Sequence, residues 1–163
     1  MILLSNSTLE GVTPSSFQER FKRIKRIAII YPEEKKWIRI AEYTLRRLYD
    51  LPEPFEFLIL QASQLDRNPE DQIVEIIQMV YRPRKPDRDD LIKKISKFNP
   101  DILFQLEPQP DERLIRLLMS LPVNLKIGFG PEQSGLDIVY SQNKTGFYEK
   151  NILNLIALIN PGS

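Results

Sequence analysis

The sequence predicts a three-layer α/β domain, in which a mostly parallel sheet is covered by helices on both faces. Two observations lead to this fold class. First, short β-branched apolar runs alternate along the chain with longer segments that have helical apolar periodicity. Second, the strand runs are continuously apolar, which is typical of strands that are buried on both faces. With 163 residues, 42% of them hydrophobic and 28% charged, the chain has the size and composition of one globular domain.

The chain is expected to begin with an extended arm and a basic helix. Residues 1–14 carry Ser, Thr, Asn, Gly and Pro without periodicity and predict the arm. Ser16 and Glu19 match a capping box, so a helix is expected over residues 16–25. Cations surround its apolar face, and they are Arg20, Lys22, Arg23, Lys25 and Arg26. Such a helix can contact an anionic membrane or an acidic protein surface, or it can simply cover the sheet edge.

Three strands and one long helix follow in the first half of the chain. The apolar runs at residues 26–31, 55–60 and 73–81 predict the strands. A helix is expected over 34–50, ended by the prolines that follow it. Its inner apolar stripe consists of Trp37, Ala41, Leu45 and Leu48. Residues 61–72 lack periodicity and predict a loop.

The second half continues the alternation after a basic proline-rich loop at residues 82–86. The elements expected there are helices at 88–98, 111–121 and 146–159 and strands at 102–106, 125–129 and 136–140. Asp87 and Thr145 are expected to cap the first and last of these helices, and Pro110 suits the first position of the middle one. The order implies right-handed crossovers, and so a single Rossmann-like domain over residues 15–163.

Composition narrows the function classes. The chain has no cysteine and no histidine, which excludes disulfides, thiol nucleophiles and histidine catalysis. A metal would need an all-oxygen shell, and we expect no metal and no cofactor. The net charge of +1 disfavours nucleic acid as a partner. No apolar run reaches the ~20 residues of a membrane span, so we expect a cytoplasmic protein, with any membrane contact peripheral and at the inner face.

Ligands of open α/β sheets bind beyond the carboxyl ends of the strands. Here those ends carry Tyr31-Pro32-Glu33-Glu34, Gln61, Gln105-Leu106-Glu107 and Gly128-Phe129-Gly130, which together we call the strand-end rim. No glycine-rich phosphate motif occurs in the sequence. Pro32 also lacks the backbone N–H that an anion would use, and Glu33 and Glu34 would repel a phosphate.

Three groups at the rim are candidates for chemistry. Glu33 or Glu34 could act as a base or hold a cation, but acids at a helix N-terminus also offset the helix dipole. The run Gly128-Phe129-Gly130-Pro131 could let a ligand approach the backbone, or it could mark a turn. Glu107 and Asp111 could form a carboxylate pair, but acid–base work needs two different environments across a cleft. Because the structural explanation is favoured each time, we predict no catalytic, cofactor-binding or metal-binding residue.

From about residue 73 to residue 159 the pattern resembles the N-terminal half of glycosyltransferase family 9, the heptosyltransferase-like group with the GT-B fold. The resemblance lies in the runs Phe98-Asn99-Pro100-Asp101-Ile102-Leu103-Phe104-Gln105-Leu106 and Leu125-Lys126-Ile127-Gly128-Phe129-Gly130, which flank an apolar helix. Short uncharacterised Rossmann-like bacterial proteins with a basic N-terminal helix are also similar. The resemblance implies the fold. It also implies a Gly-Asp segment after the first strand, where residues 31–35 differ, and a donor-binding second domain, which we do not expect here.

These observations favour a non-catalytic accessory or scaffold subunit that acts through protein–protein contacts, with a membrane-associated complex as one setting. An enzyme is not favoured. The alternative is a degenerate glycosyltransferase half-domain that binds a sugar or nucleotide-sugar, or that pairs with a separate catalytic chain. A third hypothesis is a small hydrolase or transferase that uses Glu33 or Glu34.

Overall fold

The computed structural model describes residues 2–4, 23–51, 55–62, 73–78, 84–140 and 147–159. Within them one seven-stranded sheet forms, with the strand order β1-β7-β6-β5-β2-β3-β4. The elements are β1 Ile2–Leu4, β2 Arg26–Ile30, α2 Lys35–Tyr49, β3 Glu56–Gln61, β4 Ile73–Gln78, α3 Lys85–Phe98, β5 Ile102–Gln105, α4 Glu112–Ser120, β6 Lys126–Phe129, β7 Ile138–Tyr140 and α5 Phe147–Ile159. Strands β2 to β7 are all parallel to one another, and the edge strand β1 pairs antiparallel with β7.

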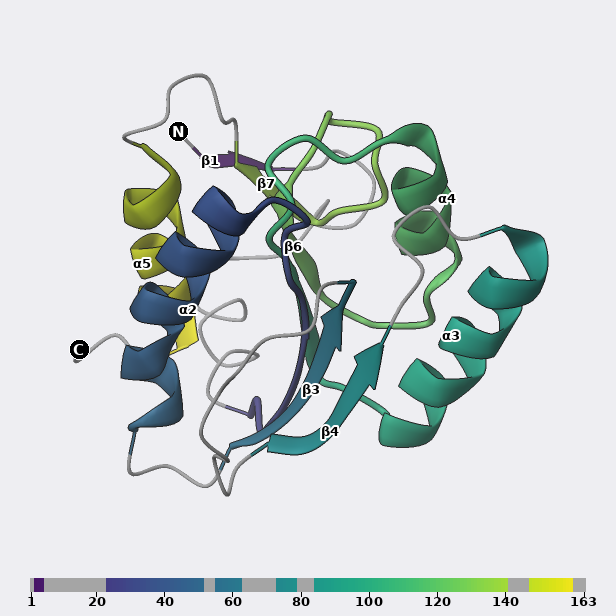
Figure 1. Ribbon diagram of the computed structural model, residues 1–163, viewed down its shortest axis with the longest axis horizontal. Helices are drawn as coiled ribbons and strands as arrows, with labels where there is room; N and C mark the ends of the chain where they lie inside the picture. The colour runs from purple at the N-terminus through teal and green to yellow at the C-terminus, as the bar shows by residue number, and fades with distance from the viewer. Residues whose placement is uncertain are drawn as a thin grey trace.

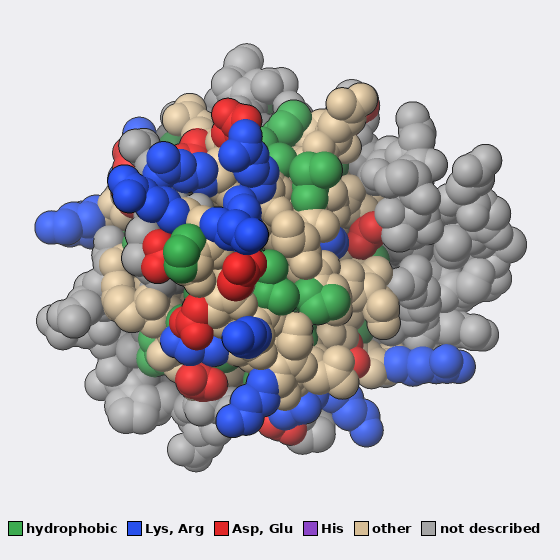
Figure 2. Space-filling view, turned by 90° about the vertical axis from the view of Figure 1, so that its right-hand side faces the viewer, with side chains coloured by type: hydrophobic (Ala, Val, Ile, Leu, Met, Phe, Trp, Pro, Cys, Tyr) green, Lys and Arg blue, Asp and Glu red, His purple; other side chains and the backbone are tan. Residues whose placement is uncertain are grey.

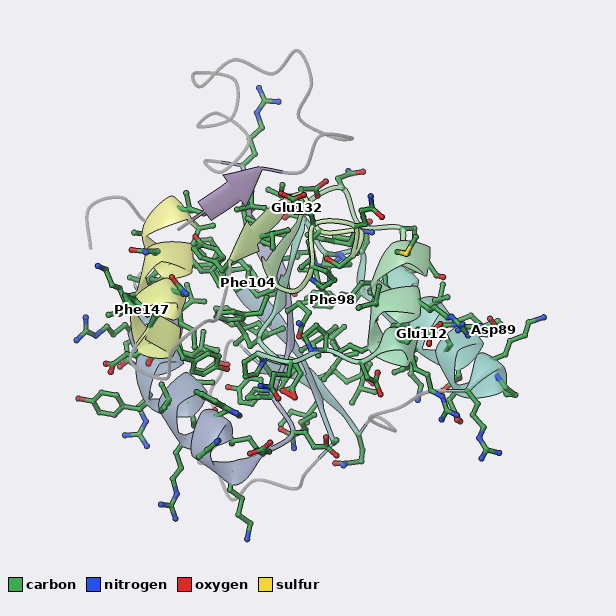
Figure 3. The ribbon with its side chains drawn as sticks, turned by 90° about the horizontal axis from the view of Figure 1, so that it is seen from above. Asp89, Phe98, Phe104, Glu112, Glu132 and Phe147 are labelled. Atoms are coloured by element: carbon green, nitrogen blue, oxygen red, sulfur yellow. The ribbon has the colours of Figure 1, made fainter. Side chains whose placement is uncertain are left out.

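The predicted three layers are confirmed. Helices α2 and α5 cover one face of the sheet, and α3 and α4 cover the other (Figure 1). The central strand β2 alternates between the two layers, because Ile27 and Ile29 pack toward α2 and α5 while Ala28 packs toward α3 and α4. The view from above shows Phe104 and Phe98 inside these two cores (Figure 3). The described part of the chain contains no helix long and apolar enough to span a membrane.

Helix α2 follows the predicted amphipathic pattern. The four residues of its expected inner stripe, Trp37, Ala41, Leu45 and Leu48, are all buried. At its N-terminal end the Trp37 ring meets the Tyr148 ring of α5 edge-on, with 4.8 Å between the ring centroids. The helix therefore buries its apolar face against both the sheet and its neighbour, and leaves only its polar face to solvent.

Two helix starts differ from the prediction. Helix α3 begins at Lys85, with Arg84 at the N-cap position, so Asp87 lies inside the first turn rather than at the cap. The early start is possible because Pro86 falls in the first turn, where its missing N–H needs no partner. Helix α4 begins after Asp111, whose carboxylate accepts the Leu114 N–H at 2.9 Å. The Asp111 side chain thus supplies the N-cap, and Pro110, which was expected at the first helical position, lies before the helix.

At the N-terminal end, part of the prediction can be compared with the structure. Ile2–Leu4 form the edge strand β1, where we expected only an extended arm. The rest of the arm, the proposed cap at Thr145 and residues 15–22 of the basic helix lie outside the described residues. The last residues expected in that helix, 23–25, are not helical. Ile24 is instead buried in the core formed with α2 and α5, and residues 24 and 25 have no regular secondary structure before β2 begins.

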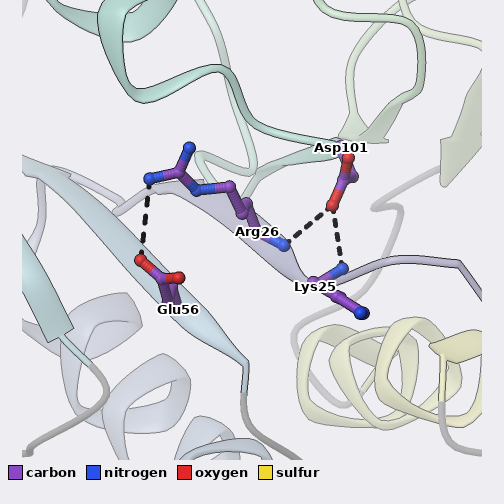
Figure 4. A network of polar contacts seen from close by, with 4 residues as sticks. All are labelled: Lys25, Arg26, Glu56 and Asp101. Carbon is purple, nitrogen blue, oxygen red and sulfur yellow. Dashed lines mark hydrogen bonds and ion pairs between the residues drawn. The ribbon is translucent and has the colours of Figure 1, made fainter.

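Asp101 fastens the start of β5 to the start of β2 (Figure 4). One carboxylate oxygen accepts the backbone N–H groups of Lys25 at 2.8 Å and Arg26 at 2.9 Å. The Arg26 guanidinium lies 4.7 Å from the centroid of the Phe98 ring and pairs with Glu56 at 3.6 Å. Asp101, which belongs to the run 98–106 on which the resemblance noted above rests, thus has a structural role at the amino end of the sheet.

We expect Asp101→Ala to lower the free energy of unfolding by about 1–2 kcal/mol, because two strand-end N–H groups lose a charged acceptor. Urea denaturation followed by circular dichroism measures the change. Asp90→Ala is the control, since it removes only the exposed ion pair with Lys94 on α3. The control should lose less than about 0.5 kcal/mol. Equal losses in the two variants would contradict this structural role.

Asp137 repeats the arrangement between β7 and β6. Its carboxylate accepts the Lys126 backbone N–H at 2.7 Å, and its own N–H donates to the Lys126 carbonyl at 2.6 Å. The Lys126 ammonium donates to the carbonyls of Leu118 at 2.6 Å and Leu121 at 3.3 Å. It therefore caps the C-terminal end of α4, where a cation is favoured by the helix dipole. Burial lowers the pKa of Lys126, and the nearby Asp137 opposes that shift.

Candidate functional site

The strand-end rim is closed at its centre by the side chain of Gln105. This fully buried residue ends β5, and its amide nitrogen donates to the carbonyls of Phe129 at 2.7 Å and Glu107 at 2.9 Å. Its amide oxygen accepts the Glu107 N–H at 2.6 Å. One side chain therefore joins the ends of β5 and β6 to the loop that follows β5. The backbone groups that it engages are not free to bind a ligand.

Gly128 allows β6 to lie against this plug. A β-carbon at residue 128 would lie only 2.1 Å from the Gln105 carbonyl oxygen, so no side chain fits between the two strands. Gly130 has more room, since the nearest atom to its β-carbon position would be the Ser134 hydroxyl at 3.0 Å. It precedes a turn in which the Ser134 N–H donates to the Pro131 carbonyl at 3.1 Å. The glycine run thus has structural reasons at both positions.

Aromatic side chains close the rim from the α5 side. The Tyr148 hydroxyl donates to the Leu106 carbonyl at 2.6 Å, and its ring centroid lies 5.1 Å from that of Phe129. Burial raises the pKa of Tyr148 well above its ordinary value of 10.0, and the Glu107 carboxylate adds to this shift. Tyr140 is also fully buried beside Phe129, but its hydroxyl has no hydrogen-bond partner among the described residues.

This difference predicts opposite results for two otherwise identical substitutions. Tyr148→Phe should cost about 1 kcal/mol of unfolding free energy at pH 7, because the Leu106 carbonyl loses its donor. Tyr140→Phe should leave stability unchanged or raise it, because it removes a buried hydroxyl that lacks a partner. Urea denaturation of both variants beside the wild type measures the difference. A larger loss in Tyr140→Phe would contradict the hydrogen bonding described here.

The same tyrosines make stability fall in alkaline solution. Burial raises the pKa of both Tyr140 and Tyr148 above 10.0, so above about pH 10 the unfolded chain releases protons that the folded chain keeps. Unfolding therefore becomes more favourable as the pH rises, by about 1.4 kcal/mol per pH unit for each tyrosine. Each Tyr→Phe variant should lose stability less steeply than the wild type between pH 10 and 11, measured by denaturation at fixed pH. Parallel slopes would contradict the prediction.

The two glutamates of the first rim loop are exposed at the start of α2. Glu34 is the N-cap residue, and its carbonyl accepts the N–H groups of Trp37 and Ile38 at 3.1 and 3.0 Å. Its carboxylate makes no capping hydrogen bond and lies 3.8 Å from the Lys36 ammonium. Glu33 is likewise exposed. This placement agrees with the dipole explanation of both residues.

The carboxylates of Glu107 and Asp111 have separate surroundings. Glu107 is buried in the rim, close enough to Tyr148 to affect the pKa of that phenol, whereas Asp111 is the N-cap of α4. The described residues also contain no group of three or more acidic side chains that could hold a metal ion. Sequence reasoning placed Gln105 at the rim but missed its role and that of Tyr148. For Gln105, the only local signal in the sequence was a polar residue at the end of an apolar strand.

Comparison with solved structures identifies one informative relative. The chain is similar to the crystal structure of the glycosyl transferase family 9 protein from Veillonella parvula DSM 2008, with a TM-score of 0.64 and 17% sequence identity. The match covers 83% of this chain and 41% of that one, so the chain spans less than half the length of the relative. No protein-family model and no curated protein sequence matches the chain. The likeness establishes the shared fold and confirms the expected resemblance at that level.

Proposed function

We propose that this chain is a non-catalytic Rossmann-like module that acts by binding another protein, as an accessory or scaffold subunit. The observation that carries the proposal is the strand-end rim, which is filled by the buried side chains of Gln105, Phe129 and Tyr148. A pyrophosphate needs free backbone N–H groups at this edge. Here Gln105 and Gly128 bring β5 and β6 together, and the first loop offers the buried Pro32.

The electrostatics of the rim support the same proposal. Glu33 and Glu34 are exposed beside the place where a phosphate would bind, and Glu107 is buried in the neighbouring loop. Three carboxylates along one edge disfavour an anionic ligand such as a nucleotide-sugar. The surfaces left for recognition are the outer faces of the helices, which suit a protein partner better than a small molecule.

A second candidate is a degenerate glycosyltransferase half-domain that binds a sugar or nucleotide-sugar, or that pairs with a separate catalytic chain. It is favoured by the structural likeness to the family 9 protein, of which this chain matches 41%. Under this alternative the rim would open when the ligand or the catalytic chain binds. A hydrolase or transferase that uses Glu33 or Glu34 is a weaker candidate, because both side chains are exposed.

Two measurements on the full chain separate these candidates. In the first, the tagged chain is cross-linked to its neighbours in its native cell, and the captured protein is identified and purified. The purified protein is then mixed with the chain, and gel filtration with light scattering measures the mass of any complex. A module should form a complex of fixed stoichiometry. In the second, the melting temperature is recorded with millimolar nucleotide-sugars. A ligand at 100 times its Kd should raise it by about 5 °C or more, and we expect no shift.

The opposite results would contradict the proposal. A nucleotide-sugar that raises the melting temperature, with no protein complex formed, would favour the half-domain. Turnover that is lost in the double variant Glu33→Gln, Glu34→Gln but kept in Glu149→Gln would favour the enzyme. Glu149 is a suitable control because it is also exposed in the first turn of a helix, α5.

A further inference from the structure

The solvent-facing side of α2 carries a row of cations around one aromatic ring. Tyr43 is 63% exposed at its centre. The exposed cations of the row are Lys35, Lys36, Arg39, Arg46 and Arg47. These positions recur every three to four residues, so they share one face of the helix. We call this surface, with its six residues, the α2 stripe. At 1.5 Å per residue it is about 18 Å long.

The charge of the α2 stripe is not balanced along its own helix. Glu42 is the only acidic residue of α2, and it is half-buried with its carboxylate accepting the Tyr31 hydroxyl. Helix α3 differs, because its five cations are interspersed with three acidic residues, and its Lys94 pairs with Asp90 at 3.1 Å. Figure 2 shows the side of the molecule that α3 and α4 cover, where red acidic side chains lie among the blue basic ones. Because the whole chain has a net charge of only +1, the positive charge of α2 leaves the remainder net acidic.

We propose that the α2 stripe is the docking surface for an acidic segment of the partner protein. The inference rests on the proposed function, and it identifies the surface and the chemistry of the partner. Apart from Lys36, whose ammonium lies 3.8 Å from the Glu34 carboxylate, no ion pair is found for the cations of the stripe among the described residues. An exposed row of such cations is complementary to a row of carboxylates. The guanidinium groups of Arg39, Arg46 and Arg47 can each hold a carboxylate in bidentate geometry. A central tyrosine supplies the aromatic contact that binding sites often use.

The same features disfavour a membrane and a nucleic acid. The apolar face of α2 is buried in the core, so the helix cannot insert into a bilayer as an amphipathic anchor does. Tyr43 is the only large apolar side chain exposed on the stripe. A longer polyanion would extend past the stripe, and the chain outside α2 has a net acidic formal charge that gives it no further net attraction. A short acidic segment avoids this, and about six extended residues span 18 Å.

The test measures binding of a fluorescein-labelled hexaglutamate peptide to the full chain by fluorescence anisotropy. Reversing three cations of the stripe, in the variant Arg39→Glu, Arg46→Glu, Arg47→Glu, should raise the Kd at least about tenfold. The matched control is Lys85→Glu, Lys93→Glu, Lys97→Glu on α3, which makes the same change in net charge and should alter the Kd less than about twofold. All six residues are exposed, and melting curves confirm that both variants fold.

Three outcomes would overturn the docking surface. Equal losses in the two triple variants would show attraction by net charge alone. If phosphatidylserine vesicles or a single-stranded DNA 12-mer bind more tightly than the hexaglutamate peptide, and the stripe reversal weakens that binding, the stripe would be a surface for a membrane or a nucleic acid instead. If the charge-reversed triple variant binds the partner protein with unchanged affinity, the stripe is not the docking surface, although the proposed function as a protein-binding module would still stand. Failure of the wild-type chain to form any complex would instead count against the proposed function.

Discussion

Replacing Gly128 by alanine is expected to lower the free energy of unfolding by about 3 kcal/mol, at the upper end of the usual cost of overpacking. The new β-carbon would lie 2.1 Å from the Gln105 carbonyl oxygen and 2.8 Å from the Gln105 carbonyl carbon. Both atoms belong to the backbone of the adjacent parallel strand, so no rotamer change relieves the clash. Strands β5 and β6 must separate at the rim, which also strains the hydrogen bonds that the Gln105 side-chain amide makes. Urea denaturation measures the loss.

Gly130→Ala is the matched control for this variant. The two glycines have the same φ of 159°, so the conformational part of the cost is shared. The atoms near a β-carbon at residue 130 belong to the side chains of Ser134 and Leu136, at 3.0 and 3.3 Å, and these can adjust. We expect its loss to be smaller than that of Gly128→Ala by at least about 1.5 kcal/mol. Similar losses would mean that backbone conformation, and not the packing of β6 on β5, explains the glycines.

The architecture could be predicted from the sequence because its signals are local. The apolar run at 26–31 and the helical stripe that contains Trp37 and Leu45 each fix an element without knowledge of its neighbours. The structure confirms both, with β2 one residue shorter than the expected strand. Apart from the unexpected edge strand β1, the errors fall at element ends: Asp87, expected as an N-cap, lies in the first turn of α3, and Asp111, expected inside its helix, is the N-cap of α4. Whether an aspartate near a helix start becomes the N-cap or lies in the first turn depends on the path of the preceding loop.

The closure of the rim could not be predicted in the same way. The Gln105 amide donates to the Phe129 carbonyl 24 residues later in the chain, and Tyr148 reaches Leu106 from 42 residues away. Sequence reasoning identified the edge of the sheet where a ligand would bind. It could not decide whether the polar groups there face a ligand or one another, because that depends on the spacing of β5 and β6. Gly128 sets this spacing, yet in the sequence it has the appearance of an ordinary turn glycine.

Lys126 is a further case in which a strand residue has a role that its local pattern conceals. It is only 9% exposed, and its ammonium caps α4 while the Asp137 carboxylate supplies the opposite charge nearby. A buried charge that loses a nearby opposite charge is left less well compensated, which destabilises the folded state. Removing the cation and the anion together avoids that penalty. The two residues should therefore be strongly non-additive in their effects on stability.

We expect Asp137→Asn to lower the free energy of unfolding by about 2 kcal/mol at pH 7, although the amide can still accept the Lys126 backbone N–H, because the buried ammonium loses a nearby negative charge and the hydrogen bond loses its charged acceptor. Lys126→Met should also lose stability, because the Leu118 and Leu121 carbonyls lose their donor and the buried Asp137 loses the nearby cation. The double variant should be more stable than Asp137→Asn alone. Urea denaturation of the wild type and the three variants measures the cycle. Simple additivity would mean that the two charges do not interact.

The dependence of Asp137→Asn on pH tests the electrostatic cause separately from packing. The folded pKa of Lys126 is already below the 10.5 of an ordinary lysine, and the variant loses the charge that raises it. The cost of burying the ammonium is complete below the folded pKa and decreases as the pH rises past it, because the folded chain then holds the lysine neutral. The deficit of Asp137→Asn relative to the wild type should therefore shrink as the pH rises from 7 toward 10.5. A deficit that stayed constant would assign the loss to shape rather than to charge.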